Sequence, residues 1–365
     1  MKIFLVGGGT GGATAPVLAV AEALKKLKPA SKFYLIGSNG IERQMLKDLK
    51  APVEYLSIPA GKWRRYFSLR NFFDIFKTAF GFLKTLFLIG KYRPDVVFGA
   101  GSYVQVPVAW AAFVRGVPVV AHQQDWDLLL STRLVAPIAS AVTVSFTYSG
   151  RELPQSSGLL KKVPKSKITV TGNPFRAEIL GGSKANAIKT FNLNENFPTV
   201  LIMGGSTGSA KINEVTMAAL PQLVNYVQII HITGGRASDF FSHPNYHQYE
   251  FLQGGLADAY AAADLVVCRA GMSTITELSA LGKAALVIPL PNSPQEDNAR
   301  LLAATQSAVG VFEESFNPDL LVKLVRKILW SKELQETLKK HIRIIFPKDA
   351  DDKIAKLLIK IHERS

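Results

Sequence analysis

Three glycine-rich segments are the parts of this sequence best suited to chemistry. They are Gly7–Gly12, Gly204–Ala210 and Arg269–Glu277, and each follows a short apolar run and precedes a segment with helical spacing. Glycines at such a turn let a phosphate approach the backbone, and the helix that follows offers free N–H groups and a partial positive charge. The segments therefore predict phosphate-binding loops, with tight strand-to-helix turns as the structural alternative.

The first loop contains the spacing of a dinucleotide-binding fingerprint, in Gly7, Gly9 and Gly12. That fingerprint also requires an acidic residue at the end of the second strand, where it holds the ribose of the cofactor. Here the second apolar run ends in residues 35–39, and the next acid is Glu42. The sequence thus argues against a nicotinamide cofactor, and we expect no cofactor at all.

The third loop and the segment after it carry side chains suited to a nucleotide sugar. Ser273 and Thr274 could cap the following helix. Glu277 lies further along that helix, where its carboxylate could accept hydrogen bonds from both ribose hydroxyls. Residues 289–299 form a polar loop that enters another helix and suits sugar hydroxyls. A solvated helix residue is the alternative interpretation of Glu277.

Four further residues have side chains of the types that take part in catalysis or metal binding. His122 follows an apolar run, at the carboxyl edge where ligands bind in open α/β sheets, although a structural histidine is the commoner case. Asp125 and Asp127 form a D-x-D pair, but a divalent metal needs several oxygen ligands, so we expect no metal. Cys268 lies in an apolar run of a chain without another cysteine, which indicates core packing.

Short apolar runs alternate with helical segments along the chain, and this order predicts parallel sheets with helices on both faces. The pattern restarts after Gly172-Asn173-Pro174, and the second glycine loop heads the second half. We therefore predict an α/β chain of two Rossmann-like lobes that face a central cleft. The predicted boundaries are 1–163 for the first lobe and 164–344 for the second, with a helix at about 345–365 that packs back on the first lobe.

The composition favours an anionic partner and a reducing compartment. The 365 residues carry 43 Lys and Arg against 28 Asp and Glu, which gives a net charge of +15. Such a surplus favours phosphorylated substrates, phospholipid head groups or nucleic acid. The single cysteine excludes an internal disulfide. The first residues, Met1–Val6, indicate a strand and not a signal peptide.

Residues 62–92 predict a patch that lies on a membrane surface. Between 70 and 91 the charged residues fall on one narrow stripe of a helix, and aromatic and aliphatic residues occupy much of the remaining circumference. These charges interrupt the ~20 apolar residues that a spanning helix needs. Cations and rings just before the helix suit anionic head groups better than RNA, and a core helix is the alternative. The patch consists of Trp63, Arg64, Arg65, Phe67, Phe72 and Phe73.

Taken in order, the motifs resemble those of the MurG family of N-acetylglucosaminyltransferases, over nearly the whole chain. The matching segments are GGGTGG at 7–12, HQQD at 122–125, GNPFR at 172–176, GGSTGS at 204–209 and RAGMSTITE at 269–277, followed by Gln295 and Asn298-Ala299. The resemblance implies a GT-B fold, UDP-GlcNAc as donor, and undecaprenyl-pyrophosphoryl-MurNAc-pentapeptide (lipid I) as acceptor. The product would be lipid II of peptidoglycan synthesis.

The resemblance also implies which residues bind the substrates. The second lobe would bind the donor, with Glu277 on the ribose, Gln295 on the GlcNAc hydroxyls and the backbone near Leu252 on the uracil. Ser206 and Arg176 would meet the diphosphate. The remaining substrate-binding residues are Thr10, Gly11, Gly12, Asp125, Met272, Ser273, Thr274, Ile275 and Thr276.

The sequence departs from the family pattern at three positions. The histidine that usually follows the first glycine loop is Ala13, the asparagine that usually closes the HEQN motif is Asp125, and the glutamine usual after GGS is Thr207. One ionisable group is lost and another appears. We therefore predict that Asp125 is the general base that takes the proton of the acceptor hydroxyl, with His122 as the fallback.

The predicted function is inverting transfer of GlcNAc to lipid I by a hexosyltransferase on the cytoplasmic face of the bacterial cell membrane, with no role for nucleic acid. One alternative is another membrane-surface UDP-sugar transferase, such as one that glycosylates diacylglycerol. A UDP-GlcNAc epimerase is disfavoured by the membrane patch, because its substrates are soluble. A UDP-sugar-binding protein with impaired catalysis remains open because of Ala13.

Overall fold

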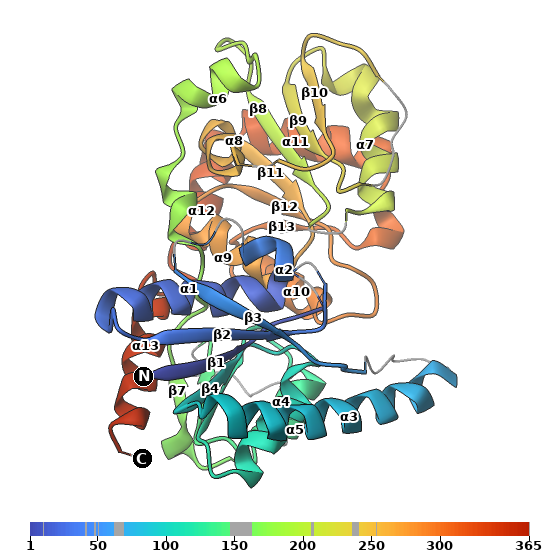
Figure 1. Ribbon diagram of the computed structural model, residues 1–365. Coiled ribbons are helices and arrows are strands. Elements are labelled where there is room, and N and C mark those ends of the chain that lie inside the picture. The colour runs from blue at the N-terminus through green and yellow to red at the C-terminus, as the bar shows by residue number, and fades with distance from the viewer. Residues whose placement is uncertain are drawn as a thin grey trace. The chain divides into compact units, whose positions relative to one another are not determined.

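The computed structural model describes residues 1–9, 11–40, 42–46, 49, 51–61, 69–146, 163–205, 208–235, 241–252 and 254–364. The chain forms two compact units, Met1–Arg176 together with Pro347–Ser365, and Ala177–Phe346. The first unit therefore runs past residue 163, where the sequence analysis placed the boundary. Each unit is a parallel sheet with helices on both faces (Figure 1), which confirms the prediction of two Rossmann-like lobes.

The first unit contains a seven-stranded parallel sheet in the order β3-β2-β1-β4-β5-β6-β7. The strand order reverses between β1 and β4, and the first glycine loop follows β1 at this switch point, where open sheets bind ligands. Phe4 on β1 pairs with Tyr34 on one side and with Val97 on the other. The strands are Lys2–Val6 (β1), Lys32–Gly37 (β2), Val53–Ser57 (β3), Val96–Gly99 (β4), Val119–Gln123 (β5), Ala141–Val144 (β6) and Ile168–Val170 (β7).

Alternate residues of these strands enter two different cores, as the period of a strand requires. Ile3 and Leu5 face a core shared with α1 and α13, whereas Phe4 and Val6 face a core shared with α3 and α4. Helix α13 packs directly against α1. The helices of this unit are Gly11–Leu27 (α1), Glu42–Met45 (α2), Leu69–Tyr92 (α3), Gln105–Val114 (α4), Leu130–Val135 (α5) and Ala350–His362 (α13).

The second unit contains a six-stranded parallel sheet in the order β10-β9-β8-β11-β12-β13, with the same reversal, here between β8 and β11. Helices α7 and α11 cover one face of this sheet through a common core. Its strands are Thr199–Met203 (β8), Gln228–Ile232 (β9), Tyr246–Tyr249 (β10), Leu265–Cys268 (β11), Ala285–Val287 (β12) and Val309–Gly310 (β13). Its α-helices are Lys184–Thr190 (α6), Ala210–Leu223 (α7), Leu256–Ala262 (α8), Met272–Leu281 (α9), Gln295–Ala304 (α10), Pro318–Trp330 (α11) and Lys332–Ile342 (α12).

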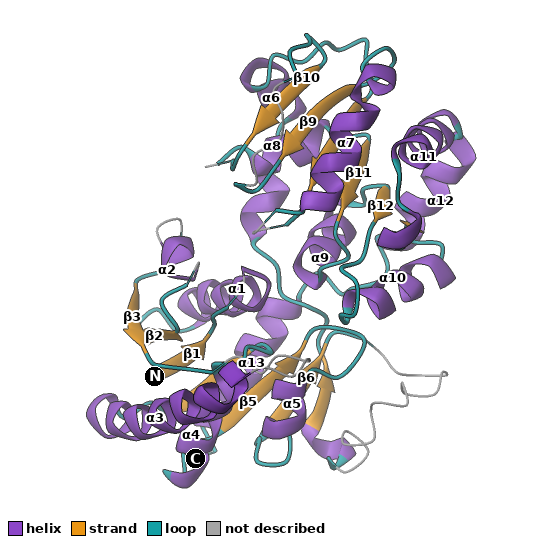
Figure 2. Ribbon diagram, turned by 90° about the vertical axis from the view of Figure 1, so that its right-hand side faces the viewer, coloured by secondary structure: helices purple, strands orange, loops and turns teal. Residues whose placement is uncertain are grey.

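Helix α3 packs beside α4 (Figure 2), and it leaves most of its large apolar residues exposed while part of its buried face is small or polar. Asp74 is only 6% exposed, and Gly81 and Thr85 are buried as well. Of the charged residues on the predicted stripe, Lys77, Lys84 and Lys91 are exposed but Asp74 is not. The exposed large apolar side chains of α3 are Phe72, Phe73, Ile75, Phe76, Phe80, Leu83 and Phe87. Among the described residues, no helix has the length and apolar content to cross a membrane.

Glycines explain why this face of α3 lies inward. A Cβ built on Gly81 would collide with the carbonyl oxygen of Pro59, and one built on Gly61 would collide with the carbonyl oxygen of Asp74. The Thr78 hydroxyl donates to the Asp74 carbonyl at 2.8 Å and accepts the Gly61 amide at 3.3 Å. The helix therefore meets the segment after β3 backbone to backbone, and bulky side chains have no room on that side.

Candidate functional site

The first glycine loop joins β1 to α1 in a conformation that only glycine adopts easily. Gly8 and Gly9 have positive φ angles of 139° and 82°. The ring of Tyr103 occupies the space that a Cβ on Gly9 would need. Gly11 and Gly12 begin α1, so their amides belong to the first turn of the helix, where the helix dipole favours an anion. The predicted ligand Thr10 lies outside the described residues.

His122 is a buried structural residue at the end of β5. Its Nδ1 lies 2.9 Å from Thr143 Oγ1, and its Nε2 lies 2.9 Å from Asn173 Oδ1. Burial lowers the pKa of His122 to about 4, against the smaller opposing effect of these hydrogen bonds. These surroundings argue against the fallback role of His122 as general base, because both ring nitrogens have partners and the side chain is fully buried. The hydrogen bond between His122 and Asn173 instead links the GNPFR segment to β5.

Asp125 lies on the loop after β5, which Gln123 holds in shape. The Gln123 side-chain amide donates to the carbonyl oxygens of Asp125 at 2.9 Å and Asp127 at 2.7 Å. Asp127 Oδ1 accepts the Leu128 amide at 2.8 Å and faces Arg133 Nη2 at 3.8 Å. Asp125 is half-buried. The two carboxylates of the D-x-D pair thus have different surroundings, and a backbone clamp fixes the loop that carries Asp125.

The second glycine loop joins β8 to α7. Gly205 and Gly208 have positive φ angles of 88° and 68°, and a Cβ on Gly208 would collide with the Thr233 carbonyl oxygen. Ser209 caps α7, because its hydroxyl accepts the Ile212 amide at 3.3 Å. The predicted diphosphate ligand Ser206 lies outside the described residues, as does Thr207. The loop therefore has the compact turn that a phosphate site requires, with its helix already capped by a side chain.

The third glycine loop leads into α9, whose start has no side-chain cap. Helix α9 begins at Met272 after Gly271, so Ser273 and Thr274 lie within its first turn and the expectation that they cap it is wrong. Met272, Ile275 and Thr276 are buried, and the Thr276 hydroxyl donates back to the Met272 carbonyl at 2.7 Å. This end of α9 therefore offers a ligand mainly backbone amides and the positive end of the helix dipole.

Glu277 is a buried carboxylate and not a solvated helix residue. Its side chain is 7% exposed, and the hydroxyl of the fully buried Tyr260 donates to Glu277 Oε2 at 3.0 Å. Burial, followed by the charge of Glu277, raises the pKa of Cys268 to about 12, and the thiol packs in the core as predicted. Tyr260 thus fixes the direction in which the Glu277 carboxylate points.

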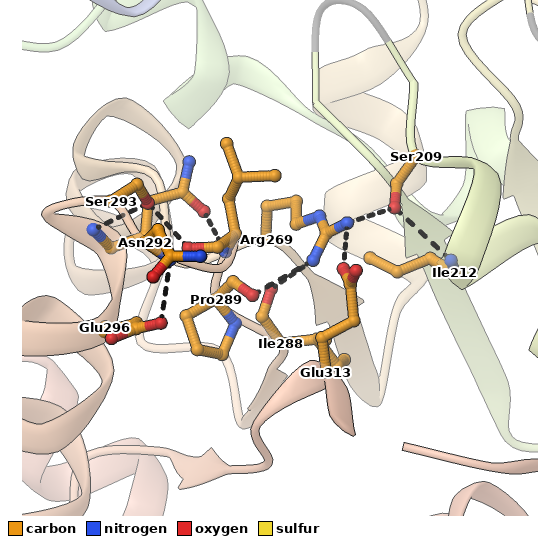
Figure 3. A network of polar contacts seen from close by, with 11 residues as sticks. Ser209, Ile212, Arg269, Ile288, Pro289, Asn292, Ser293, Glu296 and Glu313 are labelled. Atoms are coloured by element: carbon orange, nitrogen blue, oxygen red, sulfur yellow. Dashed lines mark hydrogen bonds and ion pairs between the residues drawn. The ribbon is translucent and has the colours of Figure 1, made fainter. Parts of the chain in front are cut away.

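Arg269 links the second and third glycine loops (Figure 3). One of its nitrogens, Nη1, donates to the carbonyl oxygens of Ile288 at 3.3 Å and Pro289 at 3.0 Å. Its other nitrogen, Nη2, donates to Ser209 Oγ at 2.7 Å and pairs with Glu313. From the sequence alone, Arg269 is only one residue of the RAGMSTITE motif. Its position directly after an apolar strand is the signal that could have indicated its role in holding neighbouring loops together.

Gln295 connects the polar loop at 289–294 to the start of α9. Its Oε1 accepts the Leu290 amide at 3.0 Å, and its Nε2 lies 3.9 Å from the place of a Cβ on Gly271. The Asn298 side chain donates to the Ala270 carbonyl at 3.1 Å, next to Gly271. The structure therefore brings Gln295 beside the first turn of α9. In the same loop, the backbone N–H of Asn292 donates to Glu296 Oε1 at 2.9 Å (Figure 3).

The remaining residues that the sequence predicts for substrate or membrane binding lie on other segments of the chain. Leu252 is half-buried in the loop between β10 and α8, the helix that carries Tyr260. Arg176 is half-buried at the end of the first unit's main segment. Phe72 and Phe73 are exposed on α3. The other four members of the predicted membrane patch lie outside the described residues, and they are Trp63, Arg64, Arg65 and Phe67.

Both units match known protein families. Residues 3–144 match the N-terminal domain of glycosyltransferase family 28, and residues 199–354 match its C-terminal domain. A solved MurG structure from Acinetobacter baumannii shares the fold, with a TM-score of 0.70, 24% identity, and coverage of 98% of this chain and 99% of that one. The fold and the site thus define a glycosyltransferase of the GT-B class.

Curated relatives narrow this class. A Clostridium botulinum protein is 38% identical over 329 residues, 88% of this chain and 89% of that protein, and a Clostridium kluyveri protein is 35% identical over 98% of this chain and 99% of that one. Both are named UDP-N-acetylglucosamine--N-acetylmuramyl-(pentapeptide) pyrophosphoryl-undecaprenol N-acetylglucosamine transferase. The chain belongs to this family, the MurG family.

Some structures with the same fold have another activity. The UDP-GlcNAc 2-epimerase of Neisseria meningitidis also has a TM-score of 0.70, at 17% identity, with coverage of 99% of this chain and 100% of that one. At that identity the likeness concerns the fold alone. The fold therefore does not separate transferase from epimerase, and the relatives in sequence do.

Proposed function

We propose that this protein transfers GlcNAc from UDP-GlcNAc to lipid I and so forms lipid II in peptidoglycan synthesis. The observation that carries this function is the identity of 35–38% to transferases of that name over most of both chains. The acceptor hydroxyl attacks the anomeric carbon of GlcNAc with inversion, and UDP leaves. The alternative transferases and the impaired binding protein are not favoured.

The donor is bound by the second unit in this proposal. Glu277, held by Tyr260, accepts the ribose hydroxyls, and Gln295 meets the sugar beside Gly271. The uncapped first turn of α9 faces the diphosphate, because amides and a helix dipole stabilise the charge that develops on the leaving UDP. Arg269 holds the two glycine loops at the spacing that the diphosphate requires. By family resemblance, Arg176 and Ser206 add contacts to the diphosphate, and the uracil lies near Leu252.

Asp125 is proposed as the general base of the reaction. The side chain of Gln123 holds the loop of Asp125 by hydrogen bonds. His122, the residue before Gln123, has its two ring nitrogens in contact with Thr143 and Asn173. Asp125→Asn keeps the shape of the side chain and removes the base, so kcat should fall by about 10²–10⁴-fold with the affinity for UDP unchanged. Asp127→Asn is the matched control, because its carboxylate faces Arg133 and should leave kcat close to wild type. An Asp125→Asn enzyme with wild-type turnover would show that the proton goes elsewhere.

The protein is also proposed to work as a peripheral enzyme on the cytoplasmic, anionic face of the bacterial cell membrane. Exposed rings on α3 support this location, together with exposed Lys77, Lys84 and Lys91 on the same helix and the net charge of +15. Rings of this kind insert at head-group level, and lysines are attracted by anionic lipid. A lipid-linked acceptor would be reached from that surface.

One assay tests the transferase function against the epimerase that shares the fold. UDP release from UDP-GlcNAc is measured with and without a lipid I analogue, and the sugar products are separated. We expect release that depends on the acceptor and a product heavier by one GlcNAc. Conversion of UDP-GlcNAc to its 2-epimer without any acceptor would overturn the proposal.

A further inference from the structure

His231 is a fully buried histidine near the end of β9 in the second unit. Its two ring nitrogens face two other elements of that unit. Nε2 lies 3.2 Å from Asn213 Oδ1 on α7, and Nδ1 lies 2.9 Å from the Tyr246 hydroxyl on β10. The three side chains therefore link α7, β9 and β10 through one buried polar chain.

The hydrogen bonds at the Asn213 end of this chain can have only one direction. The Thr233 carbonyl can only accept, so the Asn213 amide nitrogen donates to it at 3.1 Å, and Asn213 Oδ1 is left to accept from His231 Nε2. Burial lowers the pKa of His231 to about 4, so the ring is neutral near pH 7 and carries a single N–H. That proton is therefore on Nε2. Nδ1 accepts from the Tyr246 hydroxyl, which Gln248 Oε1 also faces at 3.0 Å.

The Thr233 carbonyl at the end of this chain is also the group on which the second glycine loop packs. It lies so close to Gly208 that a Cβ there would collide with it. Gly208 has a positive φ of 68°, and its amide donates to the Gly205 carbonyl at 3.0 Å. Ser209, the next residue, caps α7. A shift of the Asn213 side chain would thus release the Thr233 carbonyl and the loop that packs on it.

We infer that His231 is a positioning residue for the diphosphate of the donor, and that it acts through Asn213 and the second glycine loop. This inference rests on the proposed function, in which that loop meets the diphosphate of UDP-GlcNAc. The imidazole N–H holds the Asn213 side chain in the orientation that supports Thr233. The loop is then already ordered before the donor binds, which removes part of the entropic cost of binding. The alternative is a histidine that contributes to folding alone.

Binding of UDP and of uridine to the full-length protein tests this role by calorimetry, with uridine measured in competition with UDP. The ratio of the two affinities reports on the diphosphate, and a smaller folded fraction weakens both ligands equally. His231→Gln keeps a side-chain N–H close to the position of Nε2 and should retain the wild-type ratio. His231→Asn keeps only the position of Nδ1, leaves Asn213 Oδ1 without its donor, and should lower the ratio about 10-fold.

Thr216→Val is the matched control. Thr216 is a fully buried residue of the same helix, α7, and its hydroxyl has no partner among the residues that the structure describes. This variant should keep the wild-type ratio. A His231→Asn protein with the wild-type ratio, or a His231→Gln protein that loses as much as His231→Asn, would overturn the inference.

Tyr246→Phe is the second variant, for the case that His231→Asn does not fold. It removes the hydroxyl that donates to Nδ1 and should lower the ratio about 3-fold, whereas an unchanged ratio would equally overturn the inference. Failure of the inference differs from failure of the proposed function. A protein that transfers GlcNAc but whose ratio does not respond to these changes refutes the role of His231 alone, and a protein that transfers no GlcNAc refutes the function.

Discussion

Helices α3 and α11 are both amphipathic, yet they bury different shares of their apolar residues. Helix α11 buries Leu321 and Ile328 against the sheet of the second unit. Helix α3 buries Leu88 and Ile89 in the core of the first unit, but it also buries the charged Asp74 and leaves seven large apolar side chains exposed. The difference teaches that an apolar face of a helix is not always the face that packs on the core.

The cause of the difference is the way in which each helix packs. Aliphatic side chains of helix α11 fill the space between this helix and its sheet. The middle of helix α3 approaches the segment after β3 so closely that Gly81 and Gly61 have no space for a Cβ. The rings of α3 are exposed in the part of the chain that the structure describes, and we propose that they meet the membrane.

The largest difference should appear in stability. Leu321→Ala in α11 removes a fully buried side chain and should lower the free energy of unfolding by about 2–5 kcal/mol. Phe80→Ala in α3 removes a larger side chain that is 64% exposed, and the change should stay within about 0.5 kcal/mol. Denaturant unfolding of both variants measures this. A comparable loss for Phe80→Ala would mean that its ring is buried in a contact of the folded chain.

Vesicle binding should show what the outer face of α3 does. Replacement of Phe72, Phe73, Phe76 and Phe80 by Ser removes four exposed rings and should weaken sedimentation with anionic vesicles roughly 100-fold. UDP-GlcNAc affinity should not change, because these residues belong to the first unit and the proposed donor site belongs to the second. Higher salt should weaken wild-type binding by screening its cations.

The matched control for the vesicle experiment is Ile344→Ser. Ile344 is 77% exposed but belongs to the second unit and not to α3. It should sediment like the wild type. If the wild type stays in solution at low salt, the membrane location is refuted and the exposed rings need another partner.

The smallest effect concerns two glycines of α3. Gly81→Ala should destabilise the protein by about 1–3 kcal/mol, because its methyl group would meet the Pro59 carbonyl. Gly90→Ala should stabilise it by about 0.5–1 kcal/mol, since Gly90 has nothing within 4 Å and alanine favours the helix. Thermal unfolding of both variants provides the measurement. A neutral Gly81→Ala would show that α3 can move outward, and the account of its close packing would fail.

The sequence predicted the fold well because it depends on patterns that adjacent residues carry. Apolar runs at Ile3–Val6 and Thr199–Met203, each followed by glycines, indicated that each half of the chain has its own sheet. The inward face of α3 could not be predicted, because it depends on Gly61 and Pro59, which meet the helix only in the folded chain.

The candidate site was predicted by residue type but not by surroundings. Glu277 was expected on α9, yet its burial and its bond from Tyr260 depend on α8. The expected cap from Ser273 or Thr274 failed because α9 begins at Met272, two residues earlier than a cap at Ser273 requires and three earlier than a cap at Thr274 requires. The two nitrogen partners of His122 come from β6 and from the GNPFR segment, which no local pattern connects to it.

The return of α13 to the first unit has a consequence for how the chain is made. Residues Ala177–Phe346 form an uninterrupted insertion within a unit assembled from both sides of it. Ile354 and Leu358 of α13 complete the core beneath α1. During synthesis the inserted unit emerges whole from the ribosome while this core still lacks its last helix. The usual order, in which the N-terminal domain folds first, is therefore reversed, and the first unit becomes complete only after α13 has been synthesised.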